Sequence, residues 1–413
     1  MKRFFSFFLV LIVLLIGLEV ASVYFIMPFP GSQLGYDEAE SESLGRVEFA
    51  YWLHRNIGWL RAVGLLLLTY ATYQLLTKSQ SKVYQYVAVG LLVVYGSVGY
   101  MVNREMMADR MFLQPIQKRV VAMKENKIPL NKLVVGFESN GQATAYPIQL
   151  IGYHHQVRDT VGGQPIMVTY CTVCRTGRVF SPLVQGQPDE FRLVGMDHFN
   201  AMFEDKRTGS WWRQATGEAV VGPLRGKGLL ELSARHMTLR EWVVDHPNTR
   251  VLQPDSTFTD EFAGMKNYER GLSKGKLTRR DSASWQPKSW VIGVEQAGFA
   301  RAYDWTTLQT KRILNDVLGG EPLLLAISPD SVSFGTWSRR VGIQTLDFQY
   351  ANRQLTDAQT HSVWSWRGRC VAGPLAGRQL ASMPKAYQEF WHSWRSFHPK
   401  TDKMLESHTA ALH

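Results

Sequence analysis

The feature of this sequence that could carry chemistry is a pair of cysteines two residues apart. Cys171 and Cys174 lie in the stretch MVTYCTVCRTGRVF, and the chain of 413 residues contains three cysteines in all. Such a C-x-x-C pair can cycle between dithiol and disulfide, supply two thiolates to a metal ion, or form an inert structural bridge. Arg175 and Arg178 follow directly, and positive charge beside a thiol favours the thiolate. The residues themselves leave the three kinds of chemistry open.

Two of these interpretations assign roles to named residues. In a redox site Cys171 is the attacking thiolate and Cys174 the resolving thiol, by analogy with other C-x-x-C pairs, with Tyr170 and Arg175 beside them. In a metal site the two cysteines and His198 bind zinc or copper. A closed zinc site needs four ligands, whereas copper tolerates fewer. Covalent c-type haem is excluded, because Arg175 stands where C-x-x-C-H requires histidine. The third interpretation is an assembly protein with an inert disulfide, and whether the protein is an enzyme stays open.

Two long parts of the chain resemble each other. LVVGFESNGQATAYPIQLI and the residues after it as far as Gly177 match WVIGVEQAGFARAYDWTTL and its continuation, with Gly136 opposite Gly293 and Gly163 opposite Gly320, both 157 residues later. Further on, GPL recurs 151 residues later and HP 152 residues later. A duplication with small loop deletions explains this pattern. The alternating apolar runs and the NG turn predict mostly strands, and each half closes with a short helical segment.

The second half serves as a control for the first. Ser328 and Ser331 stand where the first half has Cys171 and Cys174. The fold therefore does not need the thiols, which favours a functional role for them. Asp205 matches Asp357, which predicts turn chemistry; Trp212 matches Trp364, which predicts a core position; and Cys370 matches Ala219, which predicts a small buried residue.

Three polar residues are candidates for the surroundings of the cysteine pair. His198 and Asn200, in GMDHFNAMF, would point to the same face of a strand. They predict either a polar pair that lines a pocket near the cysteines or a satisfied pair at a strand edge. Gln214 has no counterpart in the second half, so it joins them. His154 and His155 are expected at the surface.

The first hundred residues predict a membrane region. Three apolar stretches are each long enough to cross a bilayer, at residues 4–27, 57–76 and 83–102. Lys2, Arg3, Lys78 and Lys82 mark one side as cytoplasmic. The region after residue 103 is then extracytoplasmic, and periplasmic in a Gram-negative cell. A cleaved first segment leads to the same result, since two spans remain.

The net charge of +11 predicts a basic protein surface that lies beside anionic membrane lipid. A nucleic-acid partner is excluded, because the sequence shows no arginine-rich arm, zinc-finger spacing or RNP-type strand. Glu19 lies inside the first apolar stretch, where a protonated or helix-paired carboxyl is the favoured interpretation.

These patterns predict N-terminal transmembrane α-helices followed by a mainly β (α+β) soluble region made of two related repeats. The predicted boundaries are 1–103 for the membrane region, 104–255 for the first repeat with the cysteine pair, 256–288 for a polar connecting segment with little core of its own, 289–401 for the second repeat without the pair, and 402–413 for the tail.

Several of the quoted motifs carry a family resemblance. AYPIQLI, GGQPIMVTYCTVCRTGRVFS, GSWWRQATGEAVVGPLRG and HPNTRVL resemble the bacterial and archaeal family called domain of unknown function 3179, over Pro115 to Thr401. The family signature is similar to Tyr-Cys-Pro-x-Cys, and this chain has Thr172 in place of the proline. Some members are described as selenoproteins. That resemblance implies redox chemistry with a protein or small-molecule redox partner, and it identifies no substrate.

Overall fold

The structure is a computed structural model that describes residues 2–27, 40–383 and 385–404. It divides into two compact units that are each assembled from several chain segments. Unit 1 comprises residues 1–113, 189–213 and 218–228, and unit 2 comprises residues 114–188, 214–217 and 229–413. Most of the predicted tail, residues 405–413, lies outside the described residues.

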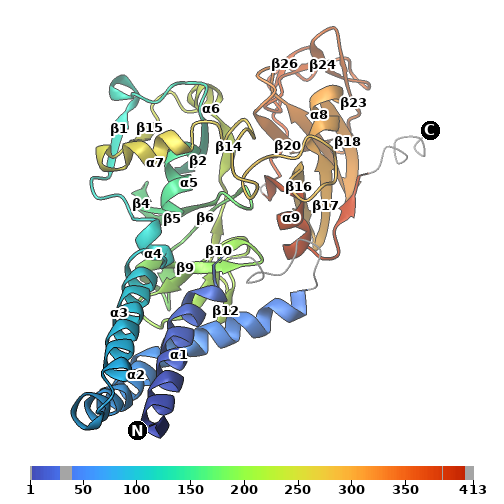
Figure 1. Ribbon diagram of the computed structural model, residues 1–413. Coiled ribbons are helices and arrows are strands. Elements are labelled where there is room, and N and C mark those ends of the chain that lie inside the picture. Colours follow the sequence, from blue (N-terminus) through green and yellow to red (C-terminus); the bar gives the residue numbers. More distant parts are fainter. Residues whose placement is uncertain (1, 28–39, 384, 405–413) are drawn as a thin grey trace. The chain divides into compact units, whose positions relative to one another are not determined.

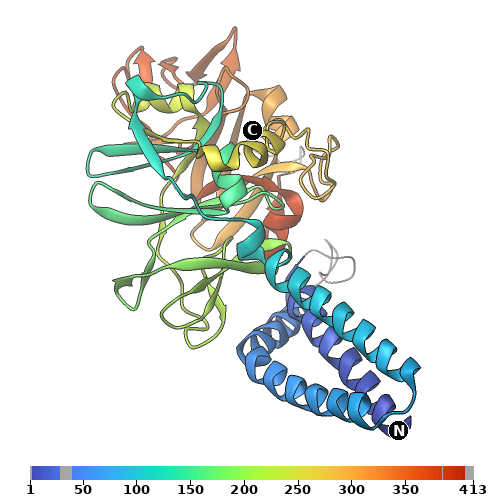
Figure 2. The same ribbon diagram turned by 60° about the vertical axis from the view of Figure 1, so that its left-hand side comes forward.

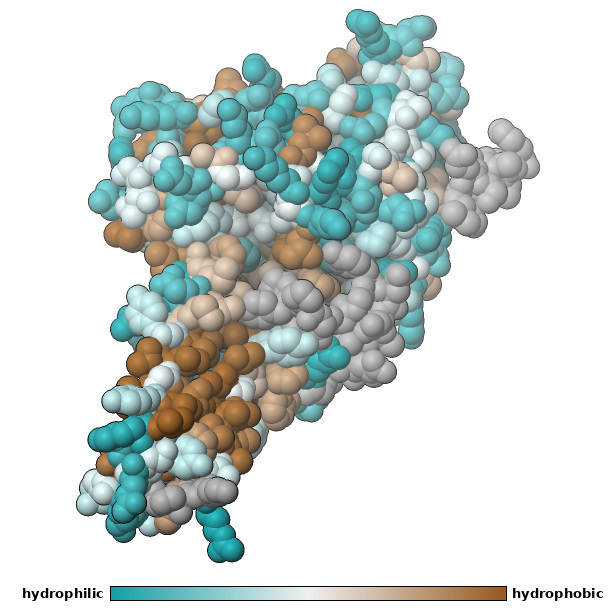
Figure 3. Space-filling model, viewed as in Figure 1, coloured by the Kyte–Doolittle hydropathy of each residue, from teal (hydrophilic) through white to brown (hydrophobic). Residues whose placement is uncertain are grey.

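Unit 1 begins with the helices α1 (Lys2–Tyr24), α2 (Glu40–Lys78) and α3 (Lys82–Arg104), followed by the single turn α4 (Ala108–Met111). All three predicted apolar stretches are helical, and α1 packs against both α2 and α3 (Figures 1 and 2). Among the described residues two helices, Arg3–Tyr24 and Lys82–Arg104, are long and apolar enough to cross a membrane. A signal sequence or a core helix of a soluble protein meets the same criterion. Apolar residues gather on the outer surface of this helical part (Figure 3).

A partly buried ion pair and an asparagine join the three helices of unit 1. Arg61 of α2 donates from Nε and Nη2 to the two carboxylate oxygens of Glu19 of α1, at 2.8 and 2.5 Å. Asn103 of α3 donates to Glu19 Oε2 at 3.0 Å and accepts from Arg61 at 2.9 Å. The Glu19 carboxylate is therefore paired with groups on the neighbouring helices. The sequence alone did not identify Arg61 and Asn103 as its partners.

Unit 1 also contains a four-stranded sheet in the order β12 (Ala219–Val221), β11 (Trp211–Arg213), β10 (Asn200–Asp205) and β9 (Phe191–Asp197). The predicted turn at Asp205 is confirmed, because its carboxylate accepts from the backbone N–H groups of Thr208 and Ser210 at 2.5 and 3.0 Å. It also accepts from the indole of buried Trp212 at 2.9 Å. Asp357 repeats these contacts with Thr360, Ser362 and Trp364 in unit 2.

Unit 2 opens with two sheets. The first has the order β1 (Arg119–Ala122), β15 (Arg250–Gln253), β3 (Gln142–Pro147), β2 (Leu133–Ser139) and β14 (Arg235–Thr238), and the second β13 (Glu231–Leu232), β6 (Thr176–Phe180), β5 (Gln164–Cys171) and β4 (Gln156–Val161). The turn between β2 and β3 has positive φ at Asn140 and Gly141, as the NG sequence predicts. The shorter elements are η1 (Met123–Glu125), α5 (Ile148–His154), β7 (Leu183–Val184), β8 (Gln187–Pro188) and α6 (Leu239–Asp245).

The later part of unit 2 has three main sheets: β27 (Ala386–Phe390), β16 (Trp290–Gln296), β17 (Phe299–Asp304), β28 (Asp402–Lys403); then β18 (Ile313–Leu318), β19 (Glu321–Ile327), β20 (Phe334–Ser338); and β23 (Phe348–Ala351), β24 (Gln354–Asp357), β25 (Val363–Trp364), β26 (Cys370–Ala372). The other elements are α8 (Trp305–Lys311), β21 (Arg340–Val341), β22 (Gln344–Thr345) and α9 (Trp391–Phe397). Cys370 is buried in β26, as predicted.

The elements that follow residue 289 occur in the same order as those that follow residue 132. β2, β3, α5, β4, β5 and β6 correspond to β16, β17, α8, β18, β19 and β20, and α6 corresponds to α9. One packing detail also recurs. A Cβ atom on Gly136 would come within 3.0 Å of the Trp242 ring, and one on Gly293 would do the same at Trp394. In both places a strand glycine lets a helix tryptophan lie flat on the sheet.

The connecting segment contributes to a neighbouring core. It contains η2 (Ser256–Phe258) and α7 (Thr259–Gly264), and Phe258, Phe262 and Tyr268 are buried in the core beside β5. Most of its other residues are exposed or half-buried, so these three aromatic side chains attach a largely polar stretch to that core.

Candidate functional site

The two cysteines lie at the turn of one β-hairpin. Cys171 is the last residue of β5, and β6 begins at Thr176, so Cys174 belongs to the four-residue connection. Arg175 closes that connection in the left-handed conformation, with φ of 58°. Both cysteines are thiols with no solvent-exposed surface.

The two sulfurs are neighbours, and burial has the largest effect on the pKa of the Cys174 thiol. The pKa of the Cys174 thiol lies well above its usual range, first because burial disfavours the thiolate and then because of a hydrogen bond with Cys171 and its charge. Lys288 and a hydrogen bond with Ser393 act in the opposite direction. The thiol form therefore predominates at neutral pH until something stabilises negative charge at this position.

Lys288 brings the positive charge that faces the pair. Its ammonium group donates to the carbonyl oxygen of Val173, between the two cysteines, at 2.5 Å, and lies 3.1 Å from His392 Nε2. Burial lowers the pKa of Lys288 to about 8, while the charges of Cys174 and Cys171 act to raise it. The lysine and the cysteines thus stabilise each other's charged forms in a dry environment.

A second row of polar groups comes from β27 and α9. Phe390 N donates to the carbonyl oxygen of Cys174 at 3.0 Å. Ser393 Oγ lies 3.1 Å from Thr176 Oγ1 and donates to Glu389 Oε2 at 3.0 Å. Glu389 in turn forms a buried ion pair with Arg178, whose guanidinium lies 3.4 Å from the Tyr387 ring. The positive charge of Arg178 is therefore paired with the Glu389 carboxylate. The positive charge that the sequence led us to expect beside the thiols comes from Lys288 instead.

The Arg175 side chain packs against residues of the later sheet. Its guanidinium lies 3.8 Å from the centre of the Trp290 ring, and its Nε donates to Gln388 Oε1 at 3.0 Å. Arg175 thus connects the cysteine hairpin to residues of the later sheet.

The structure brings Tyr170 and Gln214 to the hairpin. Gln214 Nε2 donates to Thr169 Oγ1 at 2.9 Å and to the carbonyl oxygen of Thr176 at 3.0 Å, behind the cysteines. Tyr170 is buried 3.5 Å from the hydroxyl of Tyr268, which donates to the carbonyl oxygen of Thr172 at 2.9 Å. Both residues brace the backbone that carries the pair.

His198 and Asn200 are not placed as predicted. They do not share a strand, because β9 ends at Asp197 and β10 begins at Asn200, so His198 and Phe199 form the turn with φ of 49° and 61°. Two left-handed residues match the twist of a tight hairpin, and this turn was missed because HF is not a usual sequence for it. Both residues belong to unit 1, whereas the cysteines belong to unit 2.

His198 instead takes part in a buried polar group of unit 1. Its Nδ1 lies 2.7 Å from Asp197 Oδ1, and Arg213 Nε donates to Asp197 Oδ2 at 2.7 Å. Despite burial, these partners lower the pKa of Asp197 to about 2. Asn200 is buried beside this turn.

The metal interpretation gains no further ligands from the geometry. Among the described residues there is no group of three or more histidine, cysteine, aspartate or glutamate side chains placed to hold a metal ion. Zinc or copper binding by Cys171, Cys174 and His198 stays a prediction.

His154 and His155 are buried, so their predicted surface position is wrong. His154 packs against Phe258 and Phe262 of the connecting segment. Burial lowers the pKa of His155 to about 4.

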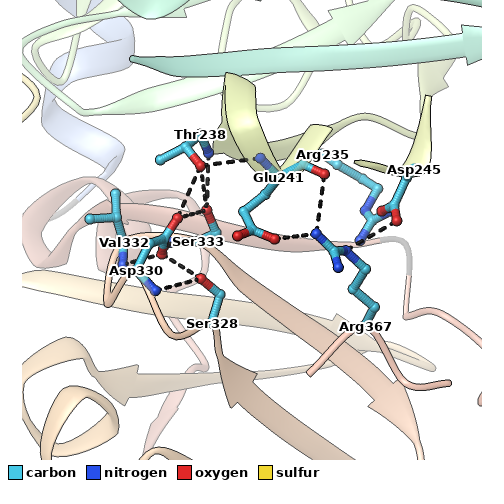
Figure 4. Close-up of polar contacts among 9 residues, drawn as sticks. All are labelled: Arg235, Thr238, Glu241, Asp245, Ser328, Asp330, Val332, Ser333 and Arg367. Carbon is cyan, nitrogen blue, oxygen red and sulfur yellow. Dashed lines mark hydrogen bonds and ion pairs between the residues drawn. The ribbon is translucent and has the colours of Figure 1, made fainter. Parts of the chain in front are cut away.

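The corresponding hairpin of the later part, residues 328–333, is held by hydroxyl and carboxylate groups (Figure 4). Thr238, at the start of α6, donates from N to Ser333 Oγ and from Oγ1 to Asp330 Oδ2, both at 3.0 Å. The two hairpins therefore exchange partners. The cysteine hairpin of the earlier part contacts β27 and α9 of the later part, and the hairpin at residues 328–333 of the later part contacts β14 and α6 of the earlier part.

Sequence reasoning missed Lys288, Glu389, His392 and Ser393. The WHSW segment was visible as a helix, but nothing in the sequence showed that it packs against the hairpin of the first half.

Comparison with known proteins agrees with the motif resemblance. No curated protein and no solved structure matches the chain. A family model matches residues 115–401, the same range over which the motifs resemble that family and more than half of the chain. The chain therefore belongs to the family described as protein of unknown function DUF3179.

Proposed function

We propose that this protein is a membrane-anchored thiol–disulfide redox protein in which Cys171 and Cys174 are the reacting pair. The observation that carries the proposal is the buried ammonium group of Lys288 directed at the backbone between the two cysteines. A fixed positive charge stabilises the thiolate that thiol–disulfide exchange requires. The same charge repels a metal cation, so the arrangement favours redox chemistry over metal delivery.

The exchange needs a disulfide of a partner protein or small molecule, R–S–S–R. The Cys171 thiolate attacks one partner sulfur, the partner S–S bond breaks, and one R–S⁻ leaves. Cys174 then loses its proton and attacks the Cys171 sulfur, which closes the Cys171–Cys174 disulfide and releases the second R–S⁻. Two electrons pass to the partner, and the two cysteine protons end on the two released thiolates.

The geometry suits Cys174 as the resolving thiol. Its raised pKa keeps Cys174 protonated until the Cys171 sulfur has been oxidised. When the proton leaves, the charge of Lys288 and a hydrogen bond from Ser393 stabilise the Cys174 thiolate. Because both sulfurs are buried, the partner reaches them only when the connection between Cys171 and Thr176 moves.

We further propose that the chain is a duplication and that its helices form three membrane spans with the later region extracytoplasmic. The shared element order and the paired glycine–tryptophan contacts support the duplication. Only 28% of the apolar window of α1 and 11% of that of α3 are buried, which supports lipid contact. Exposed Leu66, Tyr70 and Tyr73 on α2 support a third span.

Trapping with glutathione disulfide tests the order of the steps. The purified full chain in detergent is prepared as the single variants Cys171→Ser, Cys174→Ser and Cys370→Ser, and adducts are located by mass spectrometry. We expect a stable glutathione adduct on Cys171 in Cys174→Ser, and an internal disulfide in Cys370→Ser, the matched control. No adduct on Cys171, or an equal adduct on Cys174 in Cys171→Ser, would refute the proposed roles.

A further inference from the structure

Glu389 is a buried carboxylate beside the cysteine hairpin. Its Oε1 pairs with Arg178 of β6, and its Oε2 accepts a hydrogen bond from Ser393 Oγ of α9 at 3.0 Å. Ser393 also forms a hydrogen bond with Cys174. A serine hydroxyl can accept from one group while it donates to another, so Ser393 connects the Cys174 thiol to the Glu389 carboxylate.

The corresponding place beside the hairpin at residues 328–333 has no such charge pair. Strand register and helix position match three residues there to Arg178, Glu389 and Ser393. They are Gly335, Met237 and Glu241. Met237 is buried, and Glu241 pairs with Arg367 (Figure 4). This kind of packing between a hairpin and a strand-to-helix segment therefore forms without a buried arginine–carboxylate pair.

The buried pair of Arg178 and Glu389 thus needs a reason other than packing. Moving two charges out of water costs desolvation free energy, and apolar residues of similar volume are often at least as stable. Of the two corresponding places, the one beside the cysteines has the charges. This difference indicates that the carboxylate takes part in the chemistry of the thiols.

The charges around Arg178 favour the uptake of a proton. Glu389 and Glu231 both pair with this one guanidinium, so the three groups together carry one negative charge in excess. A proton on Glu389 removes that excess in an environment of low polarity, where an uncompensated charge is costly.

The other titratable groups that face Cys174 are less suited to take its proton. Lys288 has a pKa of about 8 and is charged at neutral pH, so its nitrogen has no free electron pair. His392 lies 3.1 Å from that ammonium group, and burial and the charge of Lys288 hold its pKa well below its usual range. Burial raises the pKa of Tyr387, which stays protonated, and Cys171 is already bonded to the partner when Cys174 reacts.

We propose that Glu389, acting through Ser393, takes the proton of Cys174 in the resolving step. The inference rests on the proposed redox function. The S–H bond of Cys174 breaks, its proton moves to Ser393 Oγ, and the hydroxyl proton of Ser393 moves to Glu389 Oε2. The electron pair stays on the Cys174 sulfur and forms the bond to Cys171, from which the second R–S⁻ leaves. Glu389 then releases the proton, which ends on that thiolate.

The rate of the resolving step tests this inference. The reduced full chain in detergent, in the Cys370→Ser background, is mixed with glutathione disulfide and quenched with acid at successive times. Mass spectrometry then follows the Cys171–glutathione adduct and the internal disulfide. In Glu389→Gln and in Ser393→Ala we expect the adduct to accumulate and to resolve at least about tenfold more slowly at neutral pH. The difference should narrow as the pH rises, because hydroxide then removes the proton.

Three comparisons separate proton transfer from a structural or purely electrostatic role. Glu231→Gln is the matched control, because Glu231 lies 3.3 Å from Nε of the same Arg178 and accepts from Tyr387 rather than from Ser393. It should resolve no more slowly than the background chain. Ser393→Thr keeps a hydroxyl and should restore the rate that Ser393→Ala loses. Loss of a negative charge alone would favour the thiolate and speed the step, which is the opposite sign.

Ser393→Ala leaves the pair of Arg178 and Glu389 in place, so it decides the question even if Glu389→Gln does not fold. Equal or faster resolution in Ser393→Ala, or an equally large loss in Glu231→Gln, would overturn the inference and leave the redox proposal intact. A background chain that forms neither the adduct nor the internal disulfide would refute the redox proposal and, with it, this inference.

Discussion

Lys288 is the residue whose charge most affects the cysteine pair. It comes from the end of the connecting segment, yet its ammonium group reaches the carbonyl oxygen of Val173 inside the C-x-x-C loop. Its lowered pKa shows that the charge is kept at a cost of desolvation, which the nearby thiols partly offset.

Removing this charge should make the thiols harder to ionise. In Lys288→Met we expect the pH profile of iodoacetamide alkylation at Cys171 and Cys174 to move upward by about one unit, so that the rate at pH 8 falls about tenfold. The measurement is the alkylation rate by mass spectrometry across pH. Lys385→Met, which removes a surface lysine paired with Glu295 at 3.0 Å, is the control. An unchanged profile in Lys288→Met would show that its charge does not act on the pair.

The sequence supplied part of this site. The cysteine pair was recognisable from its spacing, and Gln214 from its lack of a counterpart. Lys288 was not predictable, because it lies 114 residues from Cys174 (288 − 174 = 114) in a segment that looked like an exposed connection. His198 was expected on a strand and lies in a turn, because hairpin turns with two left-handed residues usually contain Asn or Gly, which this turn lacks.

At the scale of elements, the glycine–tryptophan contacts hold a helix on a sheet in both parts of unit 2. An alanine at Gly136 or Gly293 has no room, because its Cβ atom would overlap the ring of Trp242 or Trp394. Each substitution should lower the free energy of unfolding by about 1–3 kcal/mol. Hydrogen exchange of peptides from β2 and β16 in denaturant measures the loss.

Gly264→Ala is the matched control, since nothing lies within 4 Å of the added Cβ atom on this helical glycine. It should leave stability unchanged or slightly raised. If Gly136→Ala were destabilising and Gly293→Ala were not, the two contacts would not be equivalent.

The hairpin of β9 and β10 depends on the ionised form of Asp197. Folding lowers its pKa from 3.8 to about 2, so the folded protein binds fewer protons than the unfolded chain in this range. The carboxylate therefore contributes about 2 kcal/mol above pH 4, and this contribution disappears as the pH falls towards 2. Asp197→Asn should reduce that pH dependence in the hydrogen exchange of residues 189–213 without abolishing it, because the pKa of Glu204 on β10 is also lowered to about 2. Glu190→Gln, which breaks an exposed pair with Lys206, should retain it.

The sequence predicted individual strands and turns better than it predicted which elements pack against each other. The NG turn and the Asp205 turn follow from local chemistry, because each is fixed by residues within five positions. The contact between α9 and the cysteine hairpin joins residues more than 200 positions apart, and no local preference encodes it.

At the scale of the whole molecule, two helices among the described residues, Arg3–Tyr24 and Lys82–Arg104, are long and apolar enough to cross a membrane. The proposed topology places the α2–α3 connection in the cytoplasm and the hairpin of β7 and β8 outside. A membrane-impermeant maleimide applied to intact cells should label a cysteine introduced at Gly186 and spare one introduced at Gln80, both in the Cys370→Ser background. Labelling at Gln80 with none at Gly186 would reverse the orientation.

Equilibrium redox titration of the native pair, with metal content measured on the same sample, tests the central claim most directly. The full chain is equilibrated in glutathione buffers, alkylated, and analysed for the Cys171–Cys174 peptide. We predict a reversible two-electron transition between about −300 and −150 mV and no stoichiometric metal. A pair that stays wholly reduced or wholly oxidised across this range, or zinc or copper bound one to one through the cysteines, would contradict the redox assignment.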